Sequence, residues 1–132
     1  MSTIKGQDAS SDKDTIYARQ LTGQPASGGS ATGRARVILE KDDLFKVEAG
    51  EVIVCDFIDP NMTFIIPAAS AIVEKRRGML IHGAIIAREY KIPCVTGING
   101  ATIYIRTGNI LHVDGDLGIV VIENDQKAPA KK

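Results

Sequence analysis

The chain has 132 residues, with 16 Lys and Arg against 16 Asp and Glu and a formal net charge of zero. This length predicts one compact domain and excludes a two-domain enzyme. The content of 44% hydrophobic and 24% charged residues is typical of a folded globular protein and excludes a wholly disordered chain. Because the charges balance, a nucleic-acid-binding role has little electrostatic support.

Neither a membrane span nor a secretory signal is visible. The longest apolar stretches, such as Phe64–Ala69 and Gly83–Ala87, are far shorter than the ~20 residues that a transmembrane helix needs. The first 14 residues are mostly polar and lack the apolar core of a signal peptide. We therefore expect a cytoplasmic protein that does not enter the membrane.

The two ends of the chain are expected to be loose. Residues 1–15 predict a disordered tail, residues 16–123 the folded domain, and residues 124–132 a flexible basic tail. Within the domain, residues 21–32 are rich in glycine and small side chains and predict a loop. The alternation over Ala35–Leu39 then predicts a half-buried strand.

Short β-branched runs separated by turn residues predict the other strands. They are residues 51–55, 71–74, 94–96, 102–106, 110–113 and 119–122. Asp59-Pro60 predicts the start of a brief helix, which Pro67 should end or kink. His82–Tyr90 is dense in helix formers and is followed by Pro93, so it predicts the clearest helix. These elements predict an α/β or α+β fold in which helices cover strands.

Side chains that could bind a metal are scattered. Cys55 and Cys94 lie in apolar, strand-like segments without a CxxC pair or clustered histidines, which predicts reduced core thiols. Asp114 and Asp116 flank a glycine, and this spacing is typical of a turn. No metal site is expected.

The two histidines have different settings. His112 lies in an alternating strand, and a half-exposed strand position explains it. His82 opens the predicted helix, beside the free N–H groups of the first turn. That end of a helix disfavours the imidazolium and can hold an anion, and Gly83 leaves the approach to the ring open. A phosphoryl acceptor needs these properties, although a capping or packing histidine is an alternative interpretation.

The sequence around His82 resembles a known family. Residues 78–93 read Gly-Met-Leu-Ile-His-Gly-Ala-Ile-Ile-Ala-Arg-Glu-Tyr-Lys-Ile-Pro. They are similar to the glycine-rich approach, phosphorylatable histidine, helix and closing Ile-Pro of the mobile phosphohistidine (swivelling) domain of phosphoenolpyruvate-utilising enzymes. Pyruvate phosphate dikinase, phosphoenolpyruvate synthase and rifampicin phosphotransferase contain this domain. The resemblance spans residues 21–122 and implies a compact β/β/α fold, with several short strands and two or more short helices packed on them.

The resemblance also implies roles for individual residues. His82 would carry the phosphoryl group, with Gly78, Gly83 and Ala84 supporting the phosphate. The candidate accessory residues are Arg77, Arg88 and Glu89. For Arg88 and Glu89 a surface pair is the alternative. The run Glu74-Lys75-Arg76-Arg77 is either a solvated loop or a docking surface near His82.

The partners are likewise implied by the family. There, an ATP-binding domain phosphorylates the histidine, and the domain then swings to a site where an acceptor takes the phosphoryl group. A standalone carrier of 132 residues would need an ATP-grasp-like subunit that binds Mg-ATP and an acceptor-binding subunit. It would bind no cofactor itself and would be one component of a split dikinase or phosphotransferase rather than a self-sufficient enzyme.

Four features differ from the usual family pattern. The double glycine is Arg77-Gly78 here, and the Ser-Pro-Gly of the first loop is Ser27-Gly28-Gly29. Ile81 stands where the family usually has Ser, Thr or Cys, and Gly83 stands where Ala is frequent. A hydroxyl or thiol beside the histidine would supply one charge-assisted hydrogen bond, worth ~1.5 to 3 kcal/mol. The alternative function is therefore a non-catalytic interaction or regulatory module that keeps the swivelling fold.

Overall fold

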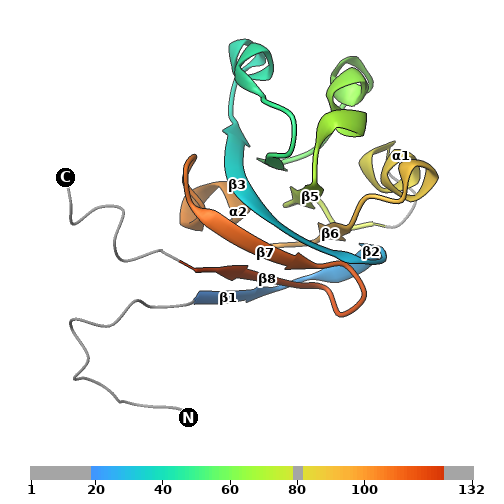
Figure 1. Cartoon of the computed structure of the whole chain (residues 1–132), viewed down its shortest axis with the longest axis vertical. Coiled ribbons are helices and arrows are strands. Elements are labelled where there is room, and N and C mark those ends of the chain that lie inside the picture. Colours follow the sequence, from blue (N-terminus) through green and yellow to red (C-terminus); the bar gives the residue numbers. More distant parts are fainter. Residues whose placement is uncertain (1–18, 79–81, 124–132) are drawn as a thin grey trace, which may run out of the picture.

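The computed structural model describes residues 19–78 and 82–123, which form one mixed eight-stranded sheet (Figure 1). The strands are β1 (Arg19–Thr22), β2 (Gln24–Ser27), β3 (Ser30–Ile38), β4 (Val52–Cys55), β5 (Ala71–Glu74), β6 (Cys94–Thr96), β7 (Ile110–Asp114) and β8 (Ile119–Ile122). Their order is β1-β8-β7-β3-β4-β5-β6-β2. Strands β3 to β6 run parallel, and the others pair antiparallel with their neighbours. The predicted tails, 1–15 and 124–132, lie outside the described residues.

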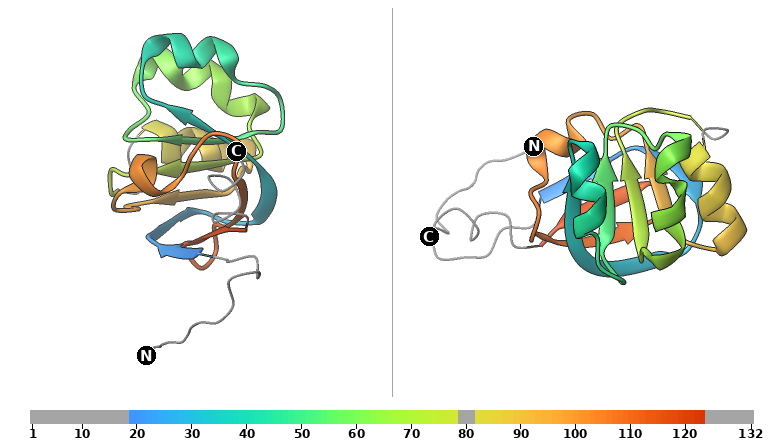
Figure 2. Two further views of the ribbon diagram at one scale, coloured as in Figure 1. Left: turned by 90° about the vertical axis from the view of Figure 1, so that its left-hand side faces the viewer. Right: turned by 90° about the horizontal axis from the view of Figure 1, so that it is seen from above.

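Helices cover one face of the parallel strands. The 3₁₀ helices η1 (Lys41–Lys46) and η2 (Pro60–Ala68) and the α-helix α1 (His82–Tyr90) follow β3, β4 and β5 in turn. They lie side by side over the same face, as the view from above shows (Figure 2). The short helix α2 (Ala101–Tyr104) packs on the opposite face, where β7, β8 and β1 also lie (Figure 1).

The parallel strands are buried on both faces, so two apolar clusters form. Ile53 and Cys55 pack toward the three helices, whereas Val52 and Val54 pack toward the antiparallel strands and α2. This double burial explains why β4 reads as a continuous apolar run. The antiparallel strands β1, β8 and β7, the parallel strands and the three helices thus form three layers. These layers confirm the predicted α/β class and its β/β/α arrangement.

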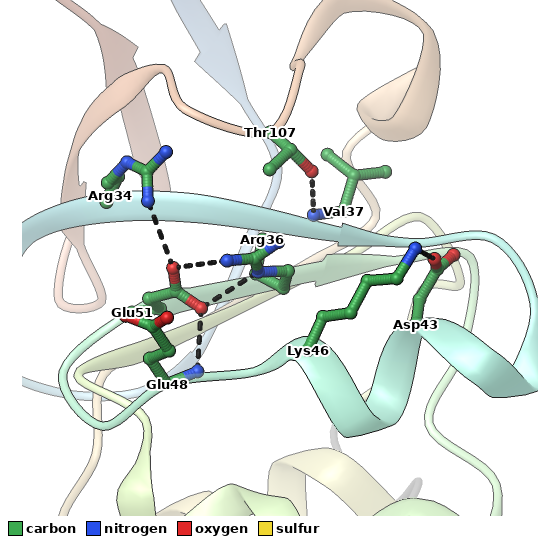
Figure 3. Close-up of polar contacts among 8 residues, drawn as sticks. All are labelled: Arg34, Arg36, Val37, Asp43, Lys46, Glu48, Glu51 and Thr107. Carbon is green, nitrogen blue, oxygen red and sulfur yellow. Dashed lines mark hydrogen bonds and ion pairs between the residues drawn. The ribbon is translucent and has the colours of Figure 1, made fainter.

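A buried ion pair stabilises the start of β4 (Figure 3). Arg36 donates from Nε and Nη2 to the two carboxylate oxygens of Glu51, both at 2.9 Å, and the Glu48 N–H donates to Oε1 at 2.8 Å. Arg34 adds a longer contact of 3.5 Å. Burial would raise the pKa of Glu51, but these hydrogen bonds and charges outweigh it, and the pKa lies below its ordinary value.

Several predicted elements are confirmed. The strands at 71–74, 94–96 and 119–122 and the helix at 82–90 have the predicted bounds, and those at 51–55 and 110–113 differ by one residue. Both cysteines are buried free thiols, as expected. Among the described residues, no helix is long and apolar enough to cross a bilayer.

Two predictions are wrong. The expected loop at 21–32 contains β2 and parts of β1 and β3, because these segments pair with strands far away in the sequence. The expected strand at 102–106 is occupied mainly by α2. Gly100 precedes that helix with a φ of 75°, and the Tyr104 and Ile105 N–H groups close its turn by donating to Gly100 and Ala101 carbonyls. The helix η1 was not predicted.

Candidate functional site

His82 is the first residue of α1 and is exposed to solvent. The helix follows β5, so it begins near the carboxyl edge of the parallel strands. The first N–H groups of an α-helix have no partner within the helix, and they give this end a partial positive charge. The structure therefore places an accessible imidazole where an anion is stabilised, as the sequence predicts. Ile81, the preceding position, lies outside the described residues.

The next two residues hold the start of α1 against the sheet. Gly83 and Ala84 are buried, and a β-carbon on Gly83 would lie 2.8 Å from Glu74 Oε1 and 3.0 Å from Ile58 Cγ1. A side chain at position 83 would thus point into the protein rather than across the approach to His82. The structure gives a reason for this glycine that differs from the predicted one: the side chains of Glu74 and Ile58 occupy the space that a β-carbon would need.

Glu74, the last residue of β5, lies beneath this first turn and is 0% exposed. Its Oε2 accepts a hydrogen bond of 2.8 Å from the Ile58 N–H, while Oε1 has no hydrogen-bond partner among residues 19–78 and 82–123. Burial raises the pKa of Glu74 to about 7, against the opposing effects of the Ile58 N–H and the Arg76 charge. The solvated-loop prediction is therefore wrong for Glu74, although Lys75, Arg76 and Arg77 are exposed.

Sequence reasoning missed this role of Glu74, although a signal existed. Side chains alternate between the faces of a strand, so the predicted strand 71–74 places Glu74 on the same face as Ile72. That face packs under the helices. Glu74 belongs both to the predicted strand 71–74 and to the charged run 74–77, and only the charged run predicts a solvated side chain.

The segment leading to His82 is anchored to β6. The buried Thr96 hydroxyl donates to the Gly78 carbonyl at 3.1 Å and accepts from the Gly78 N–H at 3.4 Å. Gly78 has a φ of 152°, which favours glycine. The Arg77 side chain lies against Gly97, where an added β-carbon would be 3.0 Å from Arg77 Nη1. Thr96 is thus a second supporting residue that the sequence did not indicate.

Arg88 and Glu89 lie away from the imidazole. Arg88 donates from Nη1 to the Ala26 carbonyl at 2.7 Å, which ties α1 to β2. It follows His82 by six residues, or ~9 Å along a helix axis. Glu89 is exposed. The structure brings together His82, Gly83 and Ala84, but not the two accessory residues at the far end of α1.

Among the described residues, the other histidine lies far from His82 in the sequence and in a different setting. The half-buried His112 of β7 is hydrogen-bonded through Nδ1 to Thr32 Oγ1 on the paired strand, at 2.8 Å, which fits its predicted strand position. Across residues 19–78 and 82–123, no three His, Cys, Asp or Glu side chains gather closely enough to hold a metal ion.

Comparison with known proteins identifies the fold around His82. The family described as "PEP-utilising enzyme, mobile domain" matches residues 47–118. The chain belongs to this family. A rifampicin phosphotransferase of Streptomyces sviceus is 39% identical over 110 residues, which are 83% of this chain and 13% of the relative. A phosphoenolpyruvate synthase of Aeropyrum pernix is 42% identical over 101 residues, or 76% of this chain and 12% of the relative. The chain thus spans a small part of these relatives.

Solved structures share the architecture. An NMR structure of Enzyme I superposes with a TM-score of 0.52 and 29% identity, covering 58% of this chain and 32% of that one. A solution structure of a UPF0107 protein has a TM-score of 0.63 at 21% identity and covers 77% and 97% of the two chains. The second likeness concerns the fold alone.

Proposed function

We propose that this mobile domain is a phosphoryl carrier in which His82 is transiently phosphorylated. The observation that carries the proposal is the exposed imidazole at the first residue of α1, above a first turn that is buried against the sheet. Membership of the mobile-domain family and the similarity to rifampicin phosphotransferase and phosphoenolpyruvate synthase support it.

The chemistry would divide one transfer into two displacements at phosphorus. A neutral imidazole nitrogen of His82 attacks the phosphorus of a donor, a P–N bond forms, and the leaving oxygen takes the electrons of the broken P–O bond. An acceptor oxygen then attacks the same phosphorus, the P–N electrons return to the imidazole, and the acceptor proton passes to solvent or a base. The chain's own contribution is to present the ring and to stabilise the bound phosphoryl group with the helix N-terminus.

We place the donor and acceptor sites on partner proteins. The donor partner would be an ATP-grasp-like subunit that binds Mg-ATP, and the second partner would bind the acceptor. An exposed histidine on a rigid sheet-and-helix body suits this role, because the ring must enter two sites in turn. Separate subunits would meet the carrier by diffusion or within a complex, without the high effective concentration that a linker supplies.

Chemical phosphorylation with phosphoramidate tests the carrier without knowledge of its partners. We expect the chain to gain one phosphoryl group by intact-mass measurement, in an acid-labile and base-stable linkage. The two histidines of the chain provide a matched pair: His82→Ala should abolish the gain and His112→Ala should retain it. Absence of label in a folded wild-type protein would favour the alternative, a non-catalytic module with the swivelling fold.

A further inference from the structure

The buried carboxyl of Glu74 lies next to the residue that follows His82. Glu74 Oε1 would be 2.8 Å from a β-carbon on Gly83 and has no hydrogen-bond partner in the part of the chain that the structure describes. A buried polar atom without a partner is rare and costly in folded proteins. Ile58 satisfies only Oε2, through its N–H. The carboxyl is thus held in a defined position with one oxygen directed toward the start of α1.

Few titratable or charged groups interact with this carboxyl. Among the described residues they are Arg76, which follows β5, and the thiols of Cys55 on β4 and Cys94 on β6; Asp56, Asp59 and Arg88 act on those thiols. Burial raises the pKa of both thiols, which therefore stay neutral near pH 7. With a pKa of about 7, Glu74 is the buried group of this set whose charge changes near neutrality.

We propose that Glu74 is a proton-linked positioning residue, which binds a proton when His82 gains a phosphoryl group and releases it when that group leaves. This inference rests on the carrier function proposed above. A phosphoryl group brings a charge of roughly −1.5 to −2 to the same end of the helix. A carboxylate beneath that end would repel it through a poorly screened interior, so the neutral carboxylic acid is favoured.

The coupling is reciprocal. If phosphorylation of His82 raises the proton affinity of Glu74, then protonation of Glu74 stabilises phosphorylated His82 by the same factor. A rise in the pKa of Glu74 by one unit from about 7 corresponds to an average uptake of about half a solvent proton per carrier near pH 7.5 during loading, and the same amount is returned during transfer to the acceptor. Through Glu74 alone, lower pH would favour the loaded carrier and higher pH would favour release, a contribution opposite in sign to the acid lability of the P–N bond.

NMR titration of the carboxyl carbons tests the coupling directly. The full chain, labelled with ¹³C at the Glu carboxyls, would be titrated before and after loading with phosphoramidate. The Glu74 signal would be assigned by its absence in Glu74→Gln. We expect loading to raise the pKa of Glu74 by about one unit, a tenfold change in proton affinity. An unchanged titration in the loaded protein would overturn the proposal.

A second measurement compares phosphohistidine lifetimes at about pH 6 and about pH 8. Relative to wild type, Glu74→Gln should lengthen the lifetime at about pH 8 and change it little at about pH 6, because the amide stays neutral where the carboxyl of wild type ionises. Glu89→Gln, which removes an exposed carboxyl from the same helix, should keep the wild-type profile. Equal profiles in wild type and Glu74→Gln would refute the coupling while leaving the carrier function intact. Failure of His82 to accept phosphoryl in either protein would refute the carrier function itself. If Glu74→Gln does not fold, the wild-type titration still decides, with its signal assigned through Glu74→Met.

Discussion

Two buried glutamates lie at opposite ends of the parallel strands and have opposite ionisation behaviour. Glu51 precedes β4 at the amino edge, and Glu74 ends β5 at the carboxyl edge, near His82. They are 4% and 0% exposed. The pKa of Glu51 lies below its ordinary value, whereas burial raises that of Glu74 to about 7.

The partners explain this difference. Glu51 accepts two hydrogen bonds from Arg36 and one from the Glu48 N–H, which together outweigh the cost of burial (Figure 3). Glu74 accepts one hydrogen bond from the Ile58 N–H, and its other oxygen accepts none from any described residue. A satisfied ion pair stabilises a fold, while an unsatisfied carboxyl beside an exposed histidine is poised to exchange a proton. Burial alone therefore does not decide the charge of a carboxyl, because the hydrogen-bond donors and charges around it also contribute.

The largest expected effect on stability comes from removing the Glu51 carboxylate from its ion pair with Arg36. Glu51→Ala should lower the free energy of unfolding by about 3 to 5 kcal/mol, because Arg36, whose side chain is 14% exposed, would lose its counter-ion. Urea unfolding measures the loss. The control is Glu48→Ala, which removes an exposed side chain but keeps the backbone donor, and it should stay within ~0.5 kcal/mol of wild type. Equal losses in both variants would show that the ion pair is not the cause.

Ionisation of Glu74 should make the free energy of unfolding depend on pH. A carboxyl with a raised pKa stabilises the fold below its ordinary value of 4.5, and this contribution is lost as the pH rises through about 7. The loss amounts to about 3 kcal/mol for a single group. Glu51 has the opposite sign, since its contribution is present above 4.5 and is lost as the pH falls.

Glu74→Gln isolates this dependence. Urea unfolding at several pH values should show wild-type stability falling between about pH 5 and pH 8 by more than that of the variant. Glu89→Gln, at an exposed position, should follow the wild type. Parallel curves for wild type and Glu74→Gln would mean that Glu74 ionises as it does in the unfolded chain.

The smallest effect concerns the contact between Glu74 and α1. Gly83→Ala should reduce stability by about 1 kcal/mol, because the added β-carbon meets Glu74 Oε1 and Ile58, and this crowding exceeds the gain in helix propensity. In a Glu74→Ala background the loss should fall by at least half. Thermal or urea unfolding of the four proteins completes the double-mutant cycle. A loss that is the same in both backgrounds would assign the crowding to Ile58.

Local signals account for the elements that were predicted correctly. His82–Tyr90 combines helix formers with a following proline, and both act within a few residues of the helix that they define. The buried strands β5 and β6 and the half-buried strand β8 are short β-branched or apolar runs between turns. The histidine at the head of the helix could therefore be found without coordinates.

Pairing over long distances accounts for the errors. Residues 19–22 form β1 because β8 offers a free edge one hundred residues further along the chain, and the small residues of β2 pair with β6 in the same way. Such partners leave no periodic pattern in a glycine-rich segment. The hydrogen bond between Gly78 and Thr96 of β6 likewise joins segments that are distant in the sequence. So does the close approach of Gly83 to the side chains of Glu74 and Ile58.

The amino-acid sequence by itself determined that an imidazole begins a helix after a β-strand, because helix and strand propensities act over short stretches of chain. Only the tertiary structure decided which side chain lies beneath the first turn of that helix. The closure of β5 against α1 removes Glu74 from water and leaves one of its oxygens without a partner. The proton affinity of a carboxyl depends on its solvation and its neighbours, and both are properties of the folded chain.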